Sequence, residues 1–482
     1  MATNYPKMAQ LRTVEQFQLR LQSLGLSLPC DSHVLSAEAE SPMAEHLQVG
    51  DLKIGNRWCI HPMEGWDANR DGSPSPLTIR RWERFGESGA KLIWGGEAAA
   101  VQACGRANPN QTLATAENEQ GLATLLRSLL QSHQAAVGST DDLVVGLQLT
   151  HSGRFCKPND HKRWEPCIAY HHPLLDAKFG IAADDDSRLL SDDELEQLID
   201  DYVKAAQMAY KLGFHFVDVK ACHGYLLHEL LSARVRPGRF GGDLSGRSLL
   251  LRTVIERIRH ECPGLSVGVR LSVFDALPFQ ASPDEGPGVP AAWNQAVPYD
   301  YGFGLNPMNP LDIDLAEPKQ LIQMLIDCGL DMLNISCGSP YYNPHIQRPA
   351  IFPPSDGYPP PEDPLAGVVR QIEVVAEVKR SFPALPVVGS GYTYLQEFLP
   401  LVAQAVVRQK WVDFVGLGRM VLSHPTMPTE TLAGKAPVRK LICRTFSDCT
   451  TAPRHGIVSG CYPLDEYYKS LPQRDVLNQA KS

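Results

Sequence analysis

Eight short β-branched runs alternate with helical patterns between about residues 56 and 420, and this alternation restricts the fold more than any other feature of the sequence. Eight successive strand–helix units predict an α/β protein of the (β/α)8 TIM-barrel class, with an open doubly wound sheet as the main alternative. The predicted strands cover residues 57–63, 91–98, 143–151, 214–222, 265–272, 331–338, 385–391 and 412–419.

The clearest predicted helix occupies residues 191–213. Ser191 and Glu194 have the spacing of a capping box, apolar residues recur at the helical period, and Gly213 is a typical helix terminator. Similar patterns predict helices at residues 78–89, 121–134, 248–261, 318–329 and 366–382.

Two terminal segments and one long loop fall outside the repeat. Residues 1–45 form a predicted N-terminal extension with one helical pattern at about residues 12–24, residues 46–434 form the barrel, and residues 435–482 form a C-terminal tail. Residues 276–310 follow the fifth strand and are rich in proline and glycine. A long loop at this end of a barrel predicts a lid that contacts substrate. Its aromatic residues are Trp293, Tyr299, Tyr301 and Phe303.

The composition favours small-molecule chemistry over binding to nucleic acid or to an anionic membrane, because the formal net charge is −9 at pH 7. No stretch of about 18 apolar residues occurs, and the first residues contain no uninterrupted apolar segment, so the sequence predicts a cytoplasmic protein. The 12 cysteines are scattered, which predicts reduced core thiols and not a disulfide framework. The sequence leaves open whether the chain forms a homo-oligomer.

Polar residues collect at the C-terminal ends of the predicted strands, where barrels of this class carry their working groups. The segment "VKACHGYLLHELLSA", residues 219–233, places Lys220, His223 and Tyr225 where an apolar strand ends. Such proton-handling groups are costly near a core unless they are partnered or used. Lys220 also suits an alternative function, that of a Schiff-base lysine in an aldolase-type barrel. The other strand-end candidates are Glu64, Gln148, His151, Arg154 and Arg270.

Glycines end the seventh and eighth predicted strands, in "GSG" and "GLGR". Glycine lets backbone N–H groups approach an anion closely, and these two strand ends are the usual phosphate position of the fold. Arg419 can add charge-assisted hydrogen bonds. The alternative interpretation is that Gly389, Gly391 and Gly418 only make tight turns.

Together these motifs resemble the old yellow enzyme family of FMN-dependent NAD(P)H:flavin oxidoreductases and ene-reductases, and within it the barrel domain of 2,4-dienoyl-CoA reductase. The resemblance covers most of residues 46–430. It rests, in this order, on "NRWCIHPMEGWDANRDGSPS", "GLQLTHSGR", "HGYLLHELLSARVRPGRFGGDLSGR", "VGVRLS", "VVGSG" and "GLGRMVLSHP".

The resemblance implies non-covalent FMN, NAD(P)H as the reductant, and hydride transfer through flavin N5 to an activated alkene such as an α,β-unsaturated carbonyl compound. It implies that His223 binds the carbonyl oxygen, that Tyr225 protonates the adjacent carbon, and that Arg270 stabilises the reduced flavin. The residues that it assigns to FMN are Pro62, Met63, Gln148, Arg270, Gly389, Ser390, Gly391, Gly418 and Arg419.

Two residues depart from the family pattern. Lys220 stands where many members have His or Asn beside His223, and Glu64 follows "PM" where Thr or Cys is common. A lysine suits a more anionic substrate, or it pairs with Glu64. Flavin-dependent oxidation of the amine dehydrogenase, demethylase or desaturase type is therefore an alternative function, and a non-catalytic flavin-binding protein is another.

The tail cysteines predict no metal site. Relatives with a 4Fe–4S cluster use a C-x2-C-x3-C-x11-C arrangement, and only the spacing from Cys449 to Cys461 matches it. Ile442 and Thr445 stand where the first two ligands would be, and Cys443 lies one residue away from the first position.

Overall fold

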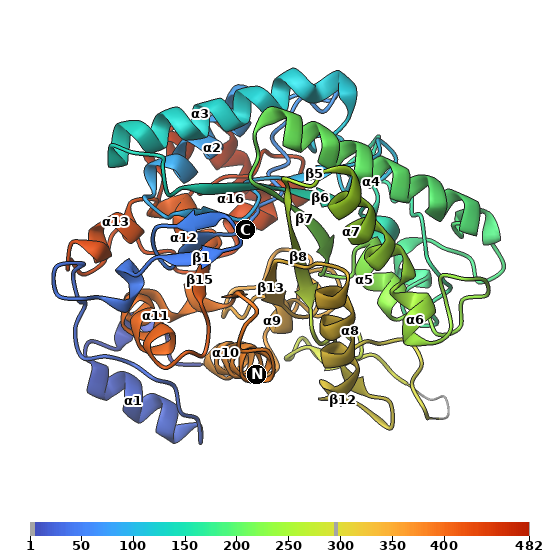
Figure 1. Cartoon of the computed structure of the whole chain (residues 1–482). Helices are drawn as coiled ribbons and strands as arrows, with labels where there is room; N and C mark the ends of the chain where they lie inside the picture. The colour runs from blue at the N-terminus through green and yellow to red at the C-terminus, as the bar shows by residue number, and fades with distance from the viewer. Residues whose placement is uncertain (1–4, 294–296, 482) are drawn as a thin grey trace.

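The computed structural model describes residues 5–293 and 297–481, and in these residues eight parallel strands close into a barrel (Figure 1). The barrel strands are β3 (Trp58–Ile60), β4 (Leu92–Ile93), β6 (Val144–Thr150), β7 (Phe216–Ala221), β8 (Ser266–Ser272), β13 (Met332–Ser336), β14 (Val387–Gly389) and β15 (Phe414–Leu417). Pairing runs in order through these strands, and β15 pairs with β3 to complete the circle. The (β/α)8 prediction is confirmed, and the open sheet is excluded.

The second barrel strand is split by two glycines. β4 pairs with the first part of β6, and β5 (Ala98–Ala100) pairs with its second part. Between them Gly96 has a φ of 49°, in the left-handed region, and a Cβ added to Gly95 would lie 2.8 Å from the backbone nitrogen of Gln148. Glycine at these positions lets the strand bend while it stays against β6.

Helices surround the strands on the outside of the barrel (Figure 1). Helix α4 (Asp192–Leu212) begins after Ser191, whose hydroxyl accepts the N–H of Glu194 while the Glu194 carboxylate accepts the N–H of Ser191. The helix ends at Gly213, which has a φ of 91°. The predicted capping box and terminator are confirmed. Further barrel helices are α2 (Pro76–Glu87), α3 (Glu119–Val137), α7 (Leu249–Glu261), α8 (Ala316–Asp327), α10 (Pro364–Ser381) and α11 (Leu399–Arg408).

A hairpin closes the N-terminal end of the barrel. Strands β1 (Leu47–Val49) and β2 (Leu52–Ile54) pair antiparallel, and Val49 and Ile54 pack into a buried cluster inside the barrel. Trp94 and Phe216 belong to the same cluster, with their rings 5.2 Å apart. Because large side chains fill this end, the space for a ligand lies at the C-terminal ends of the strands.

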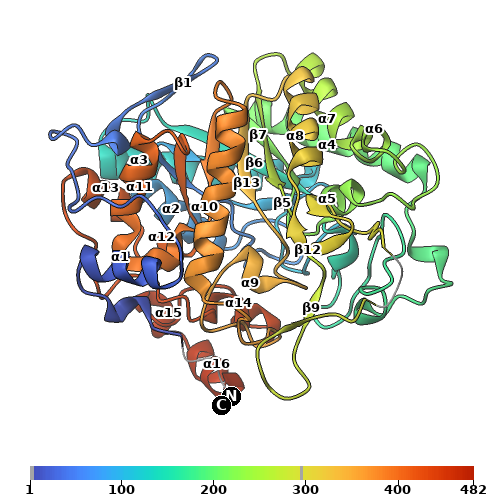
Figure 2. The same cartoon turned by 90° about the horizontal axis from the view of Figure 1, so that it is seen from below.

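The terminal segments pack on the barrel. Helix α1 (Val14–Ser23) stacks Phe17 on Phe398 with ring centroids 4.5 Å apart. The tail contributes three helices that lie together at one end of the molecule in Figure 2, α14 (Asp448–Arg454), α15 (Glu466–Lys469) and α16 (Gln473–Lys481). None of the helices in the described residues is long and apolar enough to span a membrane.

The remaining elements are short. The loop after the fifth barrel strand forms two small antiparallel pairs. They are β9 (Phe279–Gln280) with β10 (Val289–Pro290), and β11 (Leu305–Asn306) with β12 (Asn309–Ile313). The short helices are α5 (Leu226–Leu231), α6 (Leu244–Arg247), α9 (Pro344–Gln347), α12 (Arg419–Ser423) and α13 (Met427–Leu432).

Candidate active site

A cavity of about 300 Å³ lies at the C-terminal ends of the barrel strands. This volume is at the lower end of the range for small-molecule sites. The strand-end candidates His151 and Arg154 do not line it. Of the residues assigned to FMN or to catalysis, only Gly389, the last residue of β14, does not. Those that do are Pro62, Met63, Glu64, Gln148, Lys220, His223, Tyr225, Arg270, Ser390, Gly391, Gly418 and Arg419.

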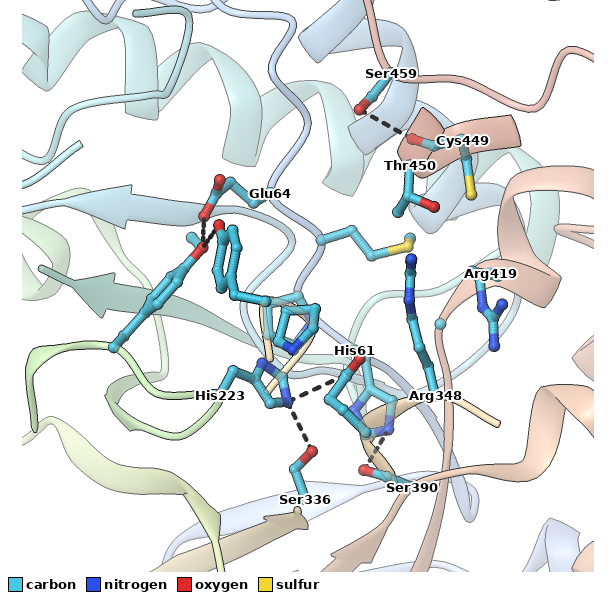
Figure 3. Close-up of a pocket in the computed structure, with 18 of the residues that line it drawn as sticks. His61, Glu64, His223, Ser336, Arg348, Ser390, Arg419, Cys449, Thr450 and Ser459 are labelled. Atoms are coloured by element: carbon cyan, nitrogen blue, oxygen red, sulfur yellow. Dashed lines mark hydrogen bonds between the residues drawn. The ribbon is translucent and has the colours of Figure 1, made fainter. Parts of the chain in front are cut away.

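Two glycine turns and two arginines with buried N–H groups lie at one end of the cavity. Gly391 has a φ of 95° and precedes a 3-10 turn after β14, and Gly418 precedes α12. Nη1 of Arg419 and Nη2 of Arg348 are buried without a hydrogen-bond partner. Figure 3 shows both arginines on the same side of the pocket. Buried N–H donors without an acceptor are costly, so this end of the cavity suits an anionic ligand.

The charge on Arg348 supports this assignment. Burial, with the neighbouring positive charges of Arg419 and Arg454, lowers the pKa of Arg348 to about 9. A guanidinium in such a place is stabilised when a phosphate shares its environment. Sequence reasoning missed Arg348, although its position after the sixth barrel strand was a usable signal.

Asp218 organises the middle of the cavity. One carboxylate oxygen accepts from Nε2 of Gln148 at 2.6 Å, and the other accepts from the backbone N–H of Arg270 at 2.6 Å. Burial raises the pKa of Asp218 to about 6. The amide of Gln148 is thereby fixed, while Nε of Arg270 is left buried without a protein partner. Asp218 is fully buried in β7 and was not predicted as a site residue.

His61 is a second residue that the sequence did not indicate. Its Nδ1 lies 3.1 Å from Nδ2 of Asn334, and its Nε2 lies 3.1 Å from Oγ of Ser390 (Figure 3). Burial and the charge of Arg270 hold its pKa well below the usual value. The neutral ring therefore connects β3, β13 and the glycine turn after β14 beneath the cavity.

His223 is held in a strained backbone conformation that turns its ring into the cavity. Its φ is 66°, which is rare for a residue with a side chain, and its backbone N–H donates to Oγ of Ser272 at 3.0 Å. The ring Nε2 lies 2.7 Å from Oγ of Ser336 (Figure 3). Burial, together with the charges of Arg270 and Lys220, holds the pKa of His223 well below its usual value, so the ring is neutral at pH 7.

Tyr225 is the centre of a second polar group. Its hydroxyl donates to Glu64 at 2.9 Å and lies 3.1 Å from the hydroxyl of Tyr341. Burial and the nearby Glu64 carboxylate hold the pKa of Tyr225 well above its usual value, so the phenol is protonated. Nζ of Lys220 lies 3.6 Å from the centre of the Tyr225 ring.

Lys220 makes no direct ion pair with Glu64, one of the two roles that the sequence left open for the lysine. The lysine contacts the face of Tyr225, and the same tyrosine donates to Glu64, so the two charges interact through this ring. The Glu64 carboxylate also accepts from Nε1 of Trp66 at 2.9 Å. Burial lowers the pKa of Lys220, and the Glu64 charge opposes that effect.

The walls of the cavity come from segments that the sequence did not indicate. Tyr341 follows β13, Lys157 and Trp164 follow β6, and Thr450 and Arg454 belong to the tail. The aromatic and basic residues in "SPYYNPHIQRP", directly after a barrel strand, were an available signal for the first of these segments.

The aromatic residues of the predicted lid lie elsewhere. In the described part of residues 276–310, Trp293, Tyr299, Tyr301 and Phe303 do not line the cavity. The rings of Trp293 and Tyr299 are 4.6 Å apart, and the Tyr299 hydroxyl lies 3.2 Å from Nε2 of His172. These aromatic side chains pack beside the cavity, so the predicted substrate contact through them has no support in the structure.

The three tail cysteines gather near Arg419. Cys443 and Cys449 both interact electrostatically with this arginine, and Cys461 interacts with both cysteines. Burial raises the pKa of each thiol. The absence of an iron–sulfur cluster stays a prediction, to be checked by iron and sulfide analysis.

A parallel barrel with a glycine-lined anion site, a buried Gln–Asp–Arg group and a His–Tyr pair at one cavity defines a flavin-dependent oxidoreductase. The model of the NADH:flavin oxidoreductase / NADH oxidase family matches residues 43–283, half of the chain, and the chain belongs to this family. Family membership assigns FMN as the cofactor and NAD(P)H as the reductant. The unpartnered N–H groups of Arg348 and Arg419 fit the FMN phosphate.

One curated relative and two solved structures are similar to the chain, and at these identities the solved structures show the shared fold alone. An NADH oxidase from Thermoanaerobacter brockii is 22% identical over 398 residues, which cover 82% of this chain and 51% of that protein, so the chain spans about half its length. A 2-naphthoyl-CoA reductase in complex with 2-naphthoyl-CoA has a TM-score of 0.66 at 16% identity, covering 90% of this chain and 58% of that one. An old yellow enzyme homologue from Zymomonas mobilis has a TM-score of 0.55 at 19% identity, covering 83% and 95%. The predicted family is confirmed.

Proposed function

We propose that this protein uses NAD(P)H to reduce an electron-poor alkene of the α,β-unsaturated carbonyl type. The observation that carries the proposal is that His223 and Tyr225 face one cavity together with the anion site of Arg348 and Arg419. FMN, when bound, supplies a hydride carrier between the nicotinamide and the substrate. Pro62, Met63, Gln148 and Arg270 would hold its ring, and the glycine turns after β14 and β15 its phosphate.

His223 binds the carbonyl oxygen of the substrate in this proposal. Its neutral ring contacts Ser336, a partner that a substrate carbonyl can replace. A hydrogen bond to the carbonyl withdraws electrons from the alkene and stabilises the enolate oxygen that develops. The Lys220 ammonium adds positive potential at the same end of the cavity.

Tyr225 delivers the proton to the carbon next to the carbonyl. Its hydroxyl is protonated and donates to Glu64, so delivery requires the O–H to exchange Glu64 for the substrate. Tyr341, 3.1 Å away, can then donate to the phenolate oxygen that remains. The Glu64–Tyr225–Tyr341 contacts thus hold the donor before transfer and stabilise it afterwards.

Glu64 supports a second candidate function, the oxidation of an amine. A carboxylate lining the cavity attracts a cationic substrate, and an amine brings its own proton and hydride to the site. In that direction Tyr225 would accept a hydrogen bond and not supply a proton. The two candidate functions therefore differ in the direction of hydride transfer. An alkene would accept a hydride from reduced FMN, whereas an amine would donate one to oxidised FMN.

The experiment that tests the proposal uses purified protein loaded with FMN under anaerobic conditions. It is reduced with NADH or NADPH and then mixed with enones, enoyl thioesters or no acceptor, while the oxidised protein is mixed with secondary amines. We expect reoxidation by at least one class of activated alkene. Bleaching by amines without reoxidation by any alkene would support the second candidate instead.

A further inference from the structure

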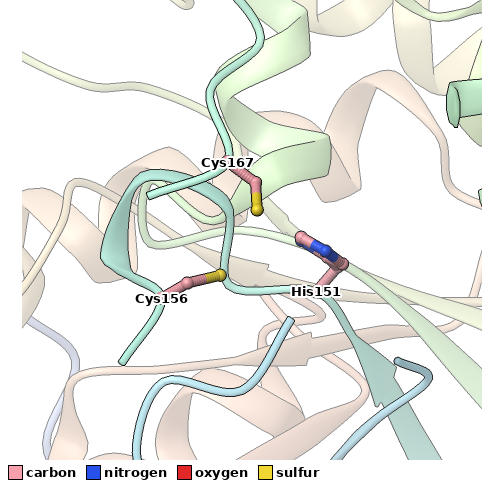
Figure 4. Close-up of side chains that lie close together, drawn as sticks. All are labelled: His151, Cys156 and Cys167. Carbon is pink, nitrogen blue, oxygen red and sulfur yellow. The ribbon is translucent and has the colours of Figure 1, made fainter. Parts of the chain in front are cut away.

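Three cysteines and a histidine gather at the C-terminal end of β6, outside the catalytic cavity. His151 follows β6 directly, Cys156 follows the 3-10 turn at Gly153–Phe155, and Cys167 lies in the loop beyond. One ring nitrogen of His151 and the sulfurs of Cys156 and Cys167 all lie within 4.8 Å of one another. His151 and Cys156 are buried, and Figure 4 shows the three side chains pointing toward one another.

Cys104 joins this group from the loop after β5. Its thiol lies within hydrogen-bond reach of the Cys167 thiol and of the His151 ring, and the Cys167 thiol is also within reach of Cys156. The next residue, Gly105, packs against the ring, because a Cβ there would lie 2.4 Å from Cδ2 of His151. Cys104 thus adds a fourth donor beside the three whose ligand atoms lie within 4.8 Å of one another.

We propose that Cys104, His151, Cys156 and Cys167 bind one zinc ion. Three thiolates and one imidazole are a donor set that holds structural zinc in tetrahedral geometry. With Zn–S bonds of about 2.3 Å, neighbouring sulfurs in a tetrahedron lie about 3.8 Å apart, so His151, Cys156 and Cys167, whose ligand atoms lie within 4.8 Å of one another, need to contract by about 1 Å. The Cys104 thiol, which donates to Gln102, has to turn toward them. Since the protein supplies all four ligands, the site is structural and leaves no position for a substrate.

Zinc binding changes the protons of the cluster. Nδ1 of His151 accepts the backbone N–H of Gly153 at 3.1 Å, and a neutral imidazole offers only one lone pair. Coordination therefore replaces this hydrogen bond or moves the ring proton. Zinc binds thiolates and not thiols, so binding also displaces thiol protons and weakens as the pH falls.

The proposed zinc ion would fix one wall of the catalytic cavity. Lys157 and Trp164 line that cavity, and both lie in the segment 156–167, whose two ends are zinc ligands. Phe155, directly before this segment, stacks on Tyr341 with ring centroids 4.0 Å apart. A metal at the base of the loop would hold these side chains at a constant position relative to the barrel.

Metal analysis of the full chain, purified without chelators, tests the proposal. We expect about one zinc per chain, as for a closed four-ligand site. Cys156→Ser and Cys167→Ser should each lower the zinc content by roughly tenfold or more. Cys262→Ser and Cys328→Ser, a buried and a half-buried cysteine outside the cluster, are the matched controls and should keep it. Cobalt added to chelator-treated wild type should show the visible bands of tetrahedral thiolate coordination.

A second measurement uses the wild-type chain and does not depend on how the variants fold. Lys162 and Arg163 are exposed trypsin sites within the segment 156–167. Removing zinc should accelerate cleavage at these sites by roughly tenfold, because the segment loses its attachment to the metal. It should also let Cys167 and the exposed Cys104 react with an alkylating agent, because their sulfurs are no longer coordinated. Alkylation of Cys328 should not change.

Three results would overturn the proposal. They are wild-type protein that has no zinc and fails to bind added zinc or cobalt, a disulfide between two of the cluster cysteines in native protein, and zinc that survives in both cluster variants. Because none of these readouts uses turnover, the zinc site can fail while the proposed function stands, and the reverse also holds.

Discussion

His223 and Tyr225 leave the end of β7 two residues apart and reach different partners in one cavity. The histidine contacts Ser336, and the tyrosine contacts Glu64. Their protonation states also differ in a useful way, since burial keeps the imidazole neutral and the phenol protonated. One side chain can therefore bind a carbonyl while the other holds the proton that alkene reduction requires.

Tyr225→Phe should separate the two half-reactions. Reduction of the bound FMN by NAD(P)H needs no proton from tyrosine and should be nearly unchanged, whereas alkene reduction should slow by about 10²–10⁴-fold, the usual range for a lost general acid. Stopped-flow absorbance measures both rates on one sample. Tyr341→Phe removes the neighbouring hydroxyl and is the matched control, with a smaller expected loss. Alkene reduction at the normal rate in Tyr225→Phe would remove the tyrosine from the mechanism.

Arg348 and Arg419 should recognise the phosphate of FMN and not its ring. Arg348→Met or Arg419→Met should weaken FMN binding by roughly 10–100-fold, because each removes a charge-assisted hydrogen bond. Riboflavin has no phosphate, so its affinity should change little. Fluorescence titration of the apoprotein with both flavins checks this prediction. An equal loss of affinity for FMN and for riboflavin would show that these arginines do not recognise the phosphate.

Buried neutral histidines should make the protein less stable in mild acid. Burial depresses the folded-state pKa of His61, His172 and His223, while in the unfolded chain each titrates near 6.5. Above that pH the histidines are neutral in both states and do not change the free energy of unfolding. Below it the unfolded state binds more protons than the folded state. Stability should then fall by up to about 1.4 kcal/mol per pH unit for each histidine. Urea unfolding at several pH values between about 7.5 and about 5 checks this. His172→Asn should make the free energy of unfolding depend less steeply on pH, whereas the control His33→Asn, at an exposed position, should not.

The barrel strands set the floor of the site, and the segments that follow them set its walls. Strand β7 supplies Asp218 and Lys220, whereas the segment after β6 supplies Lys157 and Trp164. The segment after β8 packs its aromatic residues on one another beside the cavity. Of these two segments, the one after β6 is therefore the better candidate for substrate contact.

A pair of tryptophan variants should decide which segment contacts substrate. Trp164→Ala should raise the KM for the alkene several-fold, because it removes a side chain that lines the cavity, and should leave FMN binding intact. Trp293→Ala removes a ring of the same type from the segment after β8 and should leave KM unchanged. Steady-state kinetics of both variants checks the prediction. A raised KM in Trp293→Ala with an unchanged KM in Trp164→Ala would support a substrate-contacting lid at residues 276–310.

The sequence predicted the elements whose pattern is local. All eight barrel strands and helix α4 follow from hydrophobic period and capping residues. Helix α11 was not predicted, because residues 399–407 are all buried and its sequence therefore shows no polar face. The strand-end residues could be placed around one cavity because parallel strands bring their ends together.

The parts that sequence reasoning missed depend on contacts between distant segments. Arg348, Trp164 and Arg454 reach the cavity through loops and the tail, and no local period encodes where such segments pack. The contact of Lys220 with the Tyr225 ring was also not predicted, because it depends on side-chain directions that no local pattern shows. The packing of the aromatic residues of the predicted lid beside the cavity also depends on side-chain directions, and their contact with substrate stays a prediction.

At the scale of the whole molecule, the barrel, its loops and the tail share one cavity. Residues 435–482 contribute Thr450, Arg454 and Ser459 to its lining, and Arg80 of helix α2 pairs with Asp465 of the tail at 2.9 Å. The tail is therefore part of the catalytic unit and not a separate appendage. Its arginine also adds to the positive charge near Arg348.

The most direct test of the proposed alkene reduction follows the hydride itself. The FMN-loaded protein is given nicotinamide deuterated at C4 and the best alkene from the anaerobic panel, and the saturated product is analysed by mass spectrometry and NMR. We predict one deuterium at the carbon β to the carbonyl and one solvent-derived proton at the α carbon. Oxidation of the nicotinamide without any deuterated saturated product, for every alkene of the panel, would contradict the proposed function.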